Sequence, residues 1–110
     1  MSSQTKIKAI SLTTFNSASL TTSYQAINSN GLNEACSILR IYNDASTAIT
    51  ISYDGVTDHE YLGDNDSIQI DAQTNSEPAS YLCNFPKGLI VYVKGTAGTG
   101  TIALSGYYQS

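Results

Sequence analysis

Charged residues are scarce in this chain of 110 residues. They make up 13% of the sequence, about half of the roughly 25% that is usual in globular domains. Five Lys and Arg residues stand against nine Asp and Glu residues, which gives a net charge of −4. Because binding to nucleic acid requires clustered cations that displace counterions, we expect no nucleic-acid partner.

Long apolar runs are also lacking. The longest run covers residues 89–93, whereas a membrane-spanning helix needs about 20 apolar residues, so we expect no membrane segment. Residues 1–6 lack the charged and apolar regions of a secretory signal, which predicts a protein made in the cytoplasm. The length fits a single domain, 1–110, in which the polar residues 1–6 would be able to form an N-terminal arm.

Cysteine is limited to Cys36 and Cys83, too few for a disulfide framework. Both lie in or beside apolar runs, so we predict that they are buried as small hydrophobic residues, with a bridge between them as the alternative. Tryptophan is absent, but tyrosine occurs eight times. Tyrosine is enriched at protein contacts, and its ring also suits stacking on sugars.

Short β-branched and aromatic runs, each ended by turn residues, dominate what is present. They recur about every ten residues, which predicts an all-β, single-domain β-sandwich of jelly-roll type with about eight strands. Thr, Ser, Asn and Gln supply most of the polar surface, which suits a surface covered by another protein, although β propensity explains the Thr content equally well. The runs cover residues 10–15, 19–27, 35–42, 48–53, 59–62, 67–71, 82–85, 89–94 and 101–108.

Three of these runs carry specific expectations. The nearly continuous apolar run 35–42 predicts a central strand covered on both faces, ended by a turn at 43–46. The runs 89–94 and 101–108 are expected to form a hairpin across the glycine-rich segment 95–100. The polar tract 73–78 is expected to be the longest loop.

Residues able to carry acid–base chemistry are few. His59 is the single histidine, and in Asp58-His59-Glu60 adjacent side chains would alternate across a strand instead of converging. We therefore expect no catalytic residue, no cofactor and no enzyme activity. An enzyme would remain the alternative only if His59 and its acidic neighbours lined a pocket.

The acidic turn between residues 62 and 67 offers weak calcium ligands in Asp64 and Asp66. It lacks the glycine and the distal bidentate glutamate of the helix-loop-helix calcium motif, so a solvated turn without metal is the main expectation.

Four segments, residues 38–43, 49–59, 87–95 and 106–108, resemble those of small β-sandwich virion proteins of tailed bacteriophages. The resemblance implies a structural protein of the virion, above all a capsid decoration (cement) protein, or alternatively a component of the head-to-tail junction or tail. It implies contact with the major capsid protein or other virion proteins, and a homo-oligomer such as a trimer.

The residues that we expect at such a contact lie in the long loop and near the C-terminus. They are Gln73, Thr74, Asn75, Ser76, Glu77, Tyr107 and Tyr108. A function of another class, motivated by the tyrosines and the acidic loops, is a carbohydrate-binding module for attachment to a host.

Overall fold

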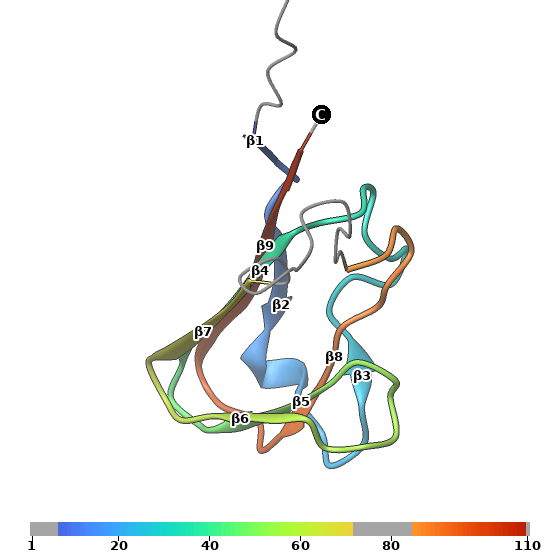
Figure 1. The fold of residues 1–110 in the computed structure, drawn as a ribbon. Coiled ribbons are helices and arrows are strands. Elements are labelled where there is room, and N and C mark those ends of the chain that lie inside the picture. The colour runs from blue at the N-terminus through green and yellow to red at the C-terminus, as the bar shows by residue number, and fades with distance from the viewer. Residues whose placement is uncertain (1–6, 72–84, 110) are drawn as a thin grey trace, which may run out of the picture.

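The computed structural model describes residues 7–71 and 85–109, which form two antiparallel sheets packed face to face (Figure 1). Five strands form the first sheet, sheet A: β1 (Ile7–Ala9), β2 (Thr13–Asn16), β4 (Ile38–Ala45), β7 (Asp66–Asp71) and β9 (Gly100–Gln109). Four shorter strands form sheet B: β3 (Gln25–Ala26), β5 (Ile49–Ser52), β6 (Glu60–Leu62) and β8 (Tyr92–Gly95). A single 3₁₀ turn, η1 (Ser17–Ser19), follows β2. No helix among the described residues is long and apolar enough to cross a membrane.

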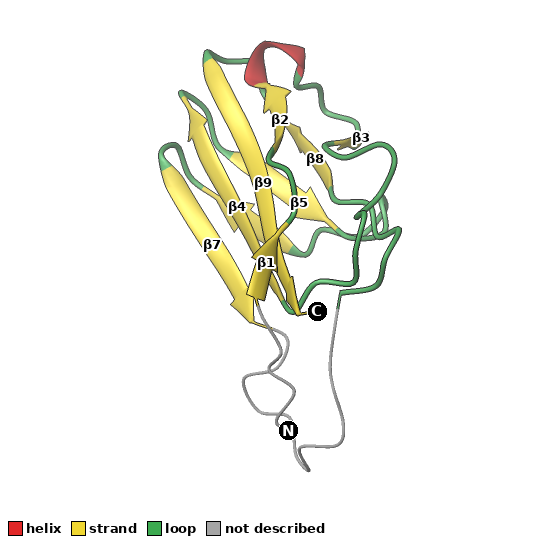
Figure 2. Ribbon diagram, turned by 90° about the horizontal axis from the view of Figure 1, so that it is seen from above, coloured by secondary structure: helices red, strands yellow, loops and turns green. Residues whose placement is uncertain are grey.

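The order of the strands is that of a jelly roll. Sheet A has the order β1-β9-β4-β7 and sheet B the order β3-β8-β5-β6. Strand β2 pairs with β9 further along the same edge as β1, so β1 and β2 act as one interrupted strand (Figure 2). Counted in this way there are eight strands, four in each sheet, and the chain passes repeatedly from one sheet to the other. The predicted fold class is confirmed.

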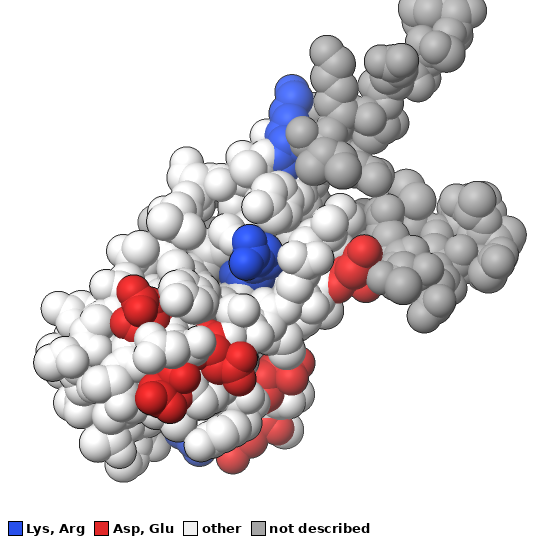
Figure 3. Space-filling view, turned by 90° about the vertical axis from the view of Figure 1, so that its left-hand side faces the viewer, with Lys and Arg blue, Asp and Glu red and all other residues white. Residues whose placement is uncertain are grey.

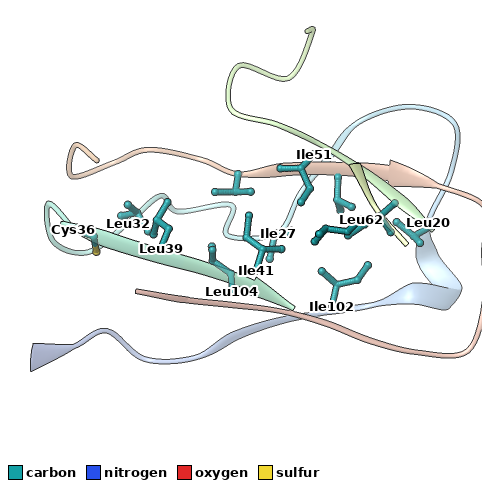
Figure 4. Packing of buried hydrophobic residues seen from close by; sticks show 13 residues of the cluster. Leu20, Ile27, Leu32, Cys36, Leu39, Ile41, Ile51, Leu62, Ile102 and Leu104 are labelled. Carbon is teal, nitrogen blue, oxygen red and sulfur yellow. The ribbon is translucent and has the colours of Figure 1, made fainter. Parts of the chain in front are cut away.

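Alternating side chains of the two sheets meet to form the core. In sheet A, Leu39 and Ile41 of β4 lie beside Ile102 and Leu104 of β9, all fully buried. They face sheet B, from which Ile51 projects into the same layer (Figure 4). Removing such a side chain from water contributes about 1.5–3 kcal/mol. The alternation of one buried and one exposed residue therefore decides which face of each strand points inward.

The expectation that the run 35–42 is covered on both faces is wrong. Strand β4 is central, between β9 and β7, but its residues Arg40, Tyr42 and Asp44 are exposed. In a two-layer sandwich each sheet has only one face to bury, so even a central strand keeps an outer face. The predicted turn at 43–46 is also misplaced, since the strand continues to Ala45.

The predicted hairpin between runs 89–94 and 101–108 is wrong as well. Strand β8 lies in sheet B between β3 and β5, whereas β9 lies in sheet A between β4 and the first strand. The glycine-rich segment crosses from one sheet to the other. Its last residue, Gly100, has φ +120° and lies so close to the carbonyl of Asp44 that a Cβ atom would be 2.0 Å from that oxygen. Glycine is thus required by the crossing and not by a tight hairpin turn.

The remaining runs have mixed outcomes. The strands expected at 48–53, 59–62 and 67–71 are present as β5, β6 and β7. The run 19–27 is mostly irregular and keeps only the two residues of β3, while the run 10–15 is a strand from Thr13 onward. The first six residues, the loop 73–78 and residues 82–84 lie outside the described residues.

Candidate functional site

A shallow hollow of about 280 Å³ lies at the free edge of sheet B, and we call it the β6 site. Its lining residues are Thr50 of β5 together with Asp58, His59, Glu60 and Tyr61. The side chain of Tyr61 is 72% exposed. The hollow therefore presents the aromatic ring of Tyr61 beside the carboxylates of Asp58 and Glu60, groups that suit the binding of another molecule.

The loop that leads into the β6 site is shaped by Ser52 and Asp54. The buried Ser52 hydroxyl donates to Asp54 Oδ1 (2.8 Å) and accepts the backbone N–H groups of Asp54 (3.2 Å) and Gly55 (2.9 Å). Asp54 Oδ1 also accepts the N–H groups of Val56 and Thr57, each at 2.8 Å. These backbone donors favour the ionised carboxylate and hold the pKa of Asp54 well below its ordinary value.

Asp58 joins this loop to β8 and to Tyr24, the residue that precedes β3. Its Oδ1 accepts a short hydrogen bond from the Tyr24 hydroxyl and lies 3.0 Å from the Lys94 ammonium. Lys94 also lies over the Tyr24 ring, 4.6 Å from its centroid. The hydrogen bond from Tyr24 and the one from Lys94 lower the pKa of Asp58. Desolvation and the bond to Asp58 raise the pKa of Tyr24 to about 12. Contacts among the side chains of Tyr24, Asp58 and Lys94 thus fix the loop against the sheet.

His59 has a structural role in this geometry. Its Nδ1 accepts the backbone N–H of Tyr53 at 3.0 Å, and its ring stacks on that of Tyr53 at 5.3 Å between centroids. The imidazole lines the hollow together with Asp58 and Glu60, so the three residues do gather around one depression. With one nitrogen engaged by the main chain, His59 is positioned to hold the loop and to contribute a ring face to the site.

Of the calcium candidates, Asp64 lies in the turn between β6 and β7 and Asp66 is the first residue of β7. Asn65 between them has φ +58°, and Asp66 Oδ1 accepts the N–H of Ser67 at 2.8 Å. Among residues 7–71 and 85–109, no group of three or more His, Cys, Asp or Glu side chains is arranged to hold a metal ion. The described residues thus add no third carboxylate, imidazole or thiolate to this pair.

A second surface, the outer face of sheet A, carries a hollow of about 340 Å³. Leu12, which is 63% exposed, and Tyr42, which is 43% exposed, give it an apolar centre. Sequence reasoning missed this surface. The signal was available in the strict alternation of β4, where every second residue from Arg40 to Asp44 is polar or aromatic. Its lining residues are Leu12, Arg40, Tyr42, Ser67, Ala103 and Ser105.

The contact residues predicted from the sequence are only partly described. Tyr107 pairs with Ile38 and with Ala9, and Tyr108 packs against the core cluster; both are half-buried. Residues 73–77 lie outside the described residues. The structure brings the two tyrosines to one end of sheet A, away from the β6 site.

Cys36 occupies the core, as predicted, and is fully buried. Its backbone pairs with Phe85, and burial followed by the nearby charge of Glu34 raises the pKa of its thiol. A buried thiol with a raised pKa is a packing residue and a poor nucleophile. Cys83 lies outside the described residues.

Comparisons with known proteins leave the family open. No protein-family model and no curated protein matches this chain. One solved chain, from a structure described as "Bacillus endospore appendages form a novel family of disulfide-linked pili", aligns over 96% of this chain and 90% of that chain. The TM-score is 0.48 and the sequence identity is 14%. A likeness of this size supports no statement about partners or activity.

Proposed function

We propose that this chain is a structural protein of a tailed-bacteriophage virion, acting as a capsid decoration protein that binds the outer shell and stabilises it. The main support for this proposal is the distribution of exposed hydrophobic side chains. Among the described residues four large ones are prominent, and they fall into two pairs: Leu12 and Tyr42 on sheet A, Val56 and Tyr61 in the β5–β6 segment of sheet B. A decoration protein needs an exposed surface with hydrophobic side chains to bind the shell, and each of these two regions offers one.

The nature of the surface supports the same proposal. Protein interfaces are depleted of charged residues and enriched in aromatic ones, and this chain has 13% charged residues and eight tyrosines. Jelly-roll sandwiches are common in viral capsid proteins, although they also occur in lectins, so the fold itself is compatible with both. The loops of the β6 site are fixed by side-chain hydrogen bonds, so little order would have to be gained on binding.

Cosedimentation with capsids that lack the protein tests the proposal. Binding of many copies per shell, in a fixed ratio, is the expected result. Binding of only about a dozen copies would move the assignment to the head-to-tail junction or the tail. Decorated particles should also break at a higher temperature, because a protein bound to the intact shell shifts its disassembly equilibrium. Equal heat resistance with and without the protein would contradict the stabilising role.

The β6 site is the surface that we assign to the shell, since it is exposed at a sheet edge. Tyr61→Glu places a charge at its most exposed ring and should abolish sedimentation with capsids. Tyr42→Glu, the matched change on the other pair, should leave capsid binding within about threefold of the parent. Loss of binding in both variants, or in neither, would contradict this assignment.

A carbohydrate-binding module is the second candidate, favoured by one feature of the same site. Tyr61 offers an exposed ring face beside Asp58, His59 and Glu60, and sugars are recognised by such faces together with carboxylate acceptors. A glycan array probed with and without calcium distinguishes the two functions. Binding that Tyr61→Ala abolishes would favour the module, and an array without signal would count against it.

A further inference from the structure

The outer face of sheet A has a pattern of charge that is complementary to itself. Along β4 the outward residues are Arg40, Tyr42 and Asp44 in succession, a cation, an aromatic ring and an anion. Alternate residues of a strand are about 7 Å apart, so the two charges flank the ring at nearly equal distances. Arg40 and Asp44 are also the only charged residues of the strand.

The residues that pair with Arg40 and Tyr42 on the neighbouring strands are uncharged, and Asp71 of β7, opposite Ile38, is a further charged residue of this face. The register places Arg40 between Gln69 and Ser105, and Tyr42 between Ser67 and Ala103. Leu12 is the other exposed hydrophobic residue of this face and lines the same hollow as Arg40 and Tyr42. The face thus has the anatomy of a protein contact, with an apolar centre and polar groups around it.

Neither charge has an ionic partner among the residues that the structure describes. In residues 7–71 and 85–109 the one ion pair is that of Lys94 with Asp58, on the other sheet. Arg40 and Asp44 make no side-chain hydrogen bond or ion pair in these residues. Figure 3 shows this side of the molecule, with most of its acidic side chains in the lower half and one basic side chain near the centre of the view. Asp64 in the adjacent β6–β7 turn and Asp66 at the start of β7 are also exposed.

Face-to-face packing of two such sheets about a two-fold axis allows two arrangements. An axis in the interface plane and parallel to β4 would set Arg40 over Arg40 and Asp44 over Asp44, a repulsive arrangement. An axis in that plane but perpendicular to β4 reverses the second strand and sets each Arg40 over the other copy's Asp44. Only the second arrangement is electrostatically favourable.

The dimensions of packed sheets fit this arrangement. Sheets pack about 10 Å apart with their strands about 30° from alignment. For an axis level with Tyr42, a residue about 7 Å from the axis is then displaced sideways by only about 4 Å from its counterpart, well within the reach of an arginine side chain.

We propose that the outer face of sheet A binds a second copy of this chain, about a two-fold axis perpendicular to β4 and level with Tyr42, so that Arg40 of each copy pairs with Asp44 of the other. The Tyr42 rings meet near the axis, and Leu12 adds to the apolar contact. This contact goes beyond the proposed function and does not depend on it, because it involves sheet A and not the β6 site.

Charge reversal with rescue is the test, read by sedimentation velocity over a series of protein concentrations. Arg40→Asp places two acidic residues opposite each other in each half of the contact, and Asp44→Arg places two basic ones. Each single variant should raise the dissociation constant of the dimer about tenfold or more. The double variant Arg40→Asp/Asp44→Arg restores opposite charges and should return within about threefold of the parent.

Two further variants make the result specific to this face. Tyr42→Glu should leave the protein monomeric, because it sets two carboxylates near the axis, whereas Tyr61→Glu on sheet B should leave the dimer intact. Far-ultraviolet circular dichroism checks that each variant is folded, as expected for substitutions of exposed residues. A parent protein that is monomeric at all concentrations would overturn the proposal, as would single reversals without effect or a double variant that is no tighter than the single ones.

Discussion

The outer face of sheet A and the β6 site of sheet B are built in different ways. Sheet A has its two longest strands, β4 and β9, side by side, and the backbone ladder between them fixes the surface without help from polar side chains. The strands of sheet B have two to four residues each, and side-chain hydrogen bonds of Ser52, Asp54 and His59 hold the loop that leads into its site.

This difference indicates where surface residues can be substituted with little loss of folding stability. Among the described residues, the outward side chains of β4, those of Arg40, Tyr42 and Asp44, make no hydrogen bond to the backbone, so they are available for contact with another protein. At the β6 site, Asp58 and His59 both hold the loop and line the hollow. Substitutions in the two regions should therefore differ in their effects on folding.

The largest effect is expected where the two sheets meet. Ile51→Ala removes a fully buried side chain from the shared core and should lower the free energy of unfolding by about 2–5 kcal/mol. Because this core supports both regions, amide hydrogen exchange should accelerate in both sheets. Val56→Ala, a truncation at a side chain that is 82% exposed, is the control and should change stability by less than about 0.5 kcal/mol. Exchange that accelerates in sheet B only would contradict a single cooperative core.

A smaller loss of stability is expected from substitution of Asn28, whose side chain forms hydrogen bonds with backbone groups close to β3. Asn28 donates to the carbonyl of Leu89 (3.0 Å) and accepts the buried N–H of Val91 (2.8 Å). Asn28→Ala leaves both groups without this partner and should cost about 1–3 kcal/mol in chemical denaturation. Gln69→Ala on the outer face of sheet A should change stability by less than about 0.5 kcal/mol. Equal losses for the two variants would remove the distinction between the regions.

The smallest effect on stability is expected from Asp54 when the pH is lowered. The pKa of Asp54 is lowered from its ordinary value of 3.8 by backbone hydrogen bonds from Thr57 and Val56 and by Ser52. A carboxyl whose folded-state pKa is lowered contributes stability above its unfolded pKa and loses it as the pH falls through the folded value. The midpoint temperature of thermal unfolding of the parent should therefore decrease below about pH 4. Asp54→Asn should be less stable than the parent at neutral pH, with the gap closing as the pH falls.

The control for this measurement is Asp64→Asn, which removes an exposed carboxylate from the β6–β7 turn. It should keep the acid dependence of the parent. If Asp54→Asn and Asp64→Asn show the same pH profile, the hydrogen bonds of Asp54 do not set the acid response of the loop.

The sequence predicted the strands whose alternation is strong and local. The run 48–53 became β5, with Ile49 and Ile51 buried, and the run 67–71 became β7. It did not predict the pairing of β8 with β3 and β5, because glycine-rich segments of similar composition serve both hairpins and crossings between sheets. The same holds for the β6 site: the sequence shows His59 beside its acidic neighbours, but it did not predict Tyr24 and Lys94, the partners of Asp58, which are more than 30 positions away from it in the chain.

By itself, then, the sequence determined an all-β sandwich and the two faces of strands with clear alternation such as β5 and β7, because side-chain alternation and turn residues act over a few neighbouring positions. Tertiary structure decided the sheet to which each strand belongs and which side chains stay exposed. Tyr42 and Leu12 illustrate the reason: they lie 30 positions apart in the chain, and only the common pairing of β2 and β4 with β9 brings them to one surface. Such juxtapositions depend on contacts between residues remote in sequence, which local pattern does not encode.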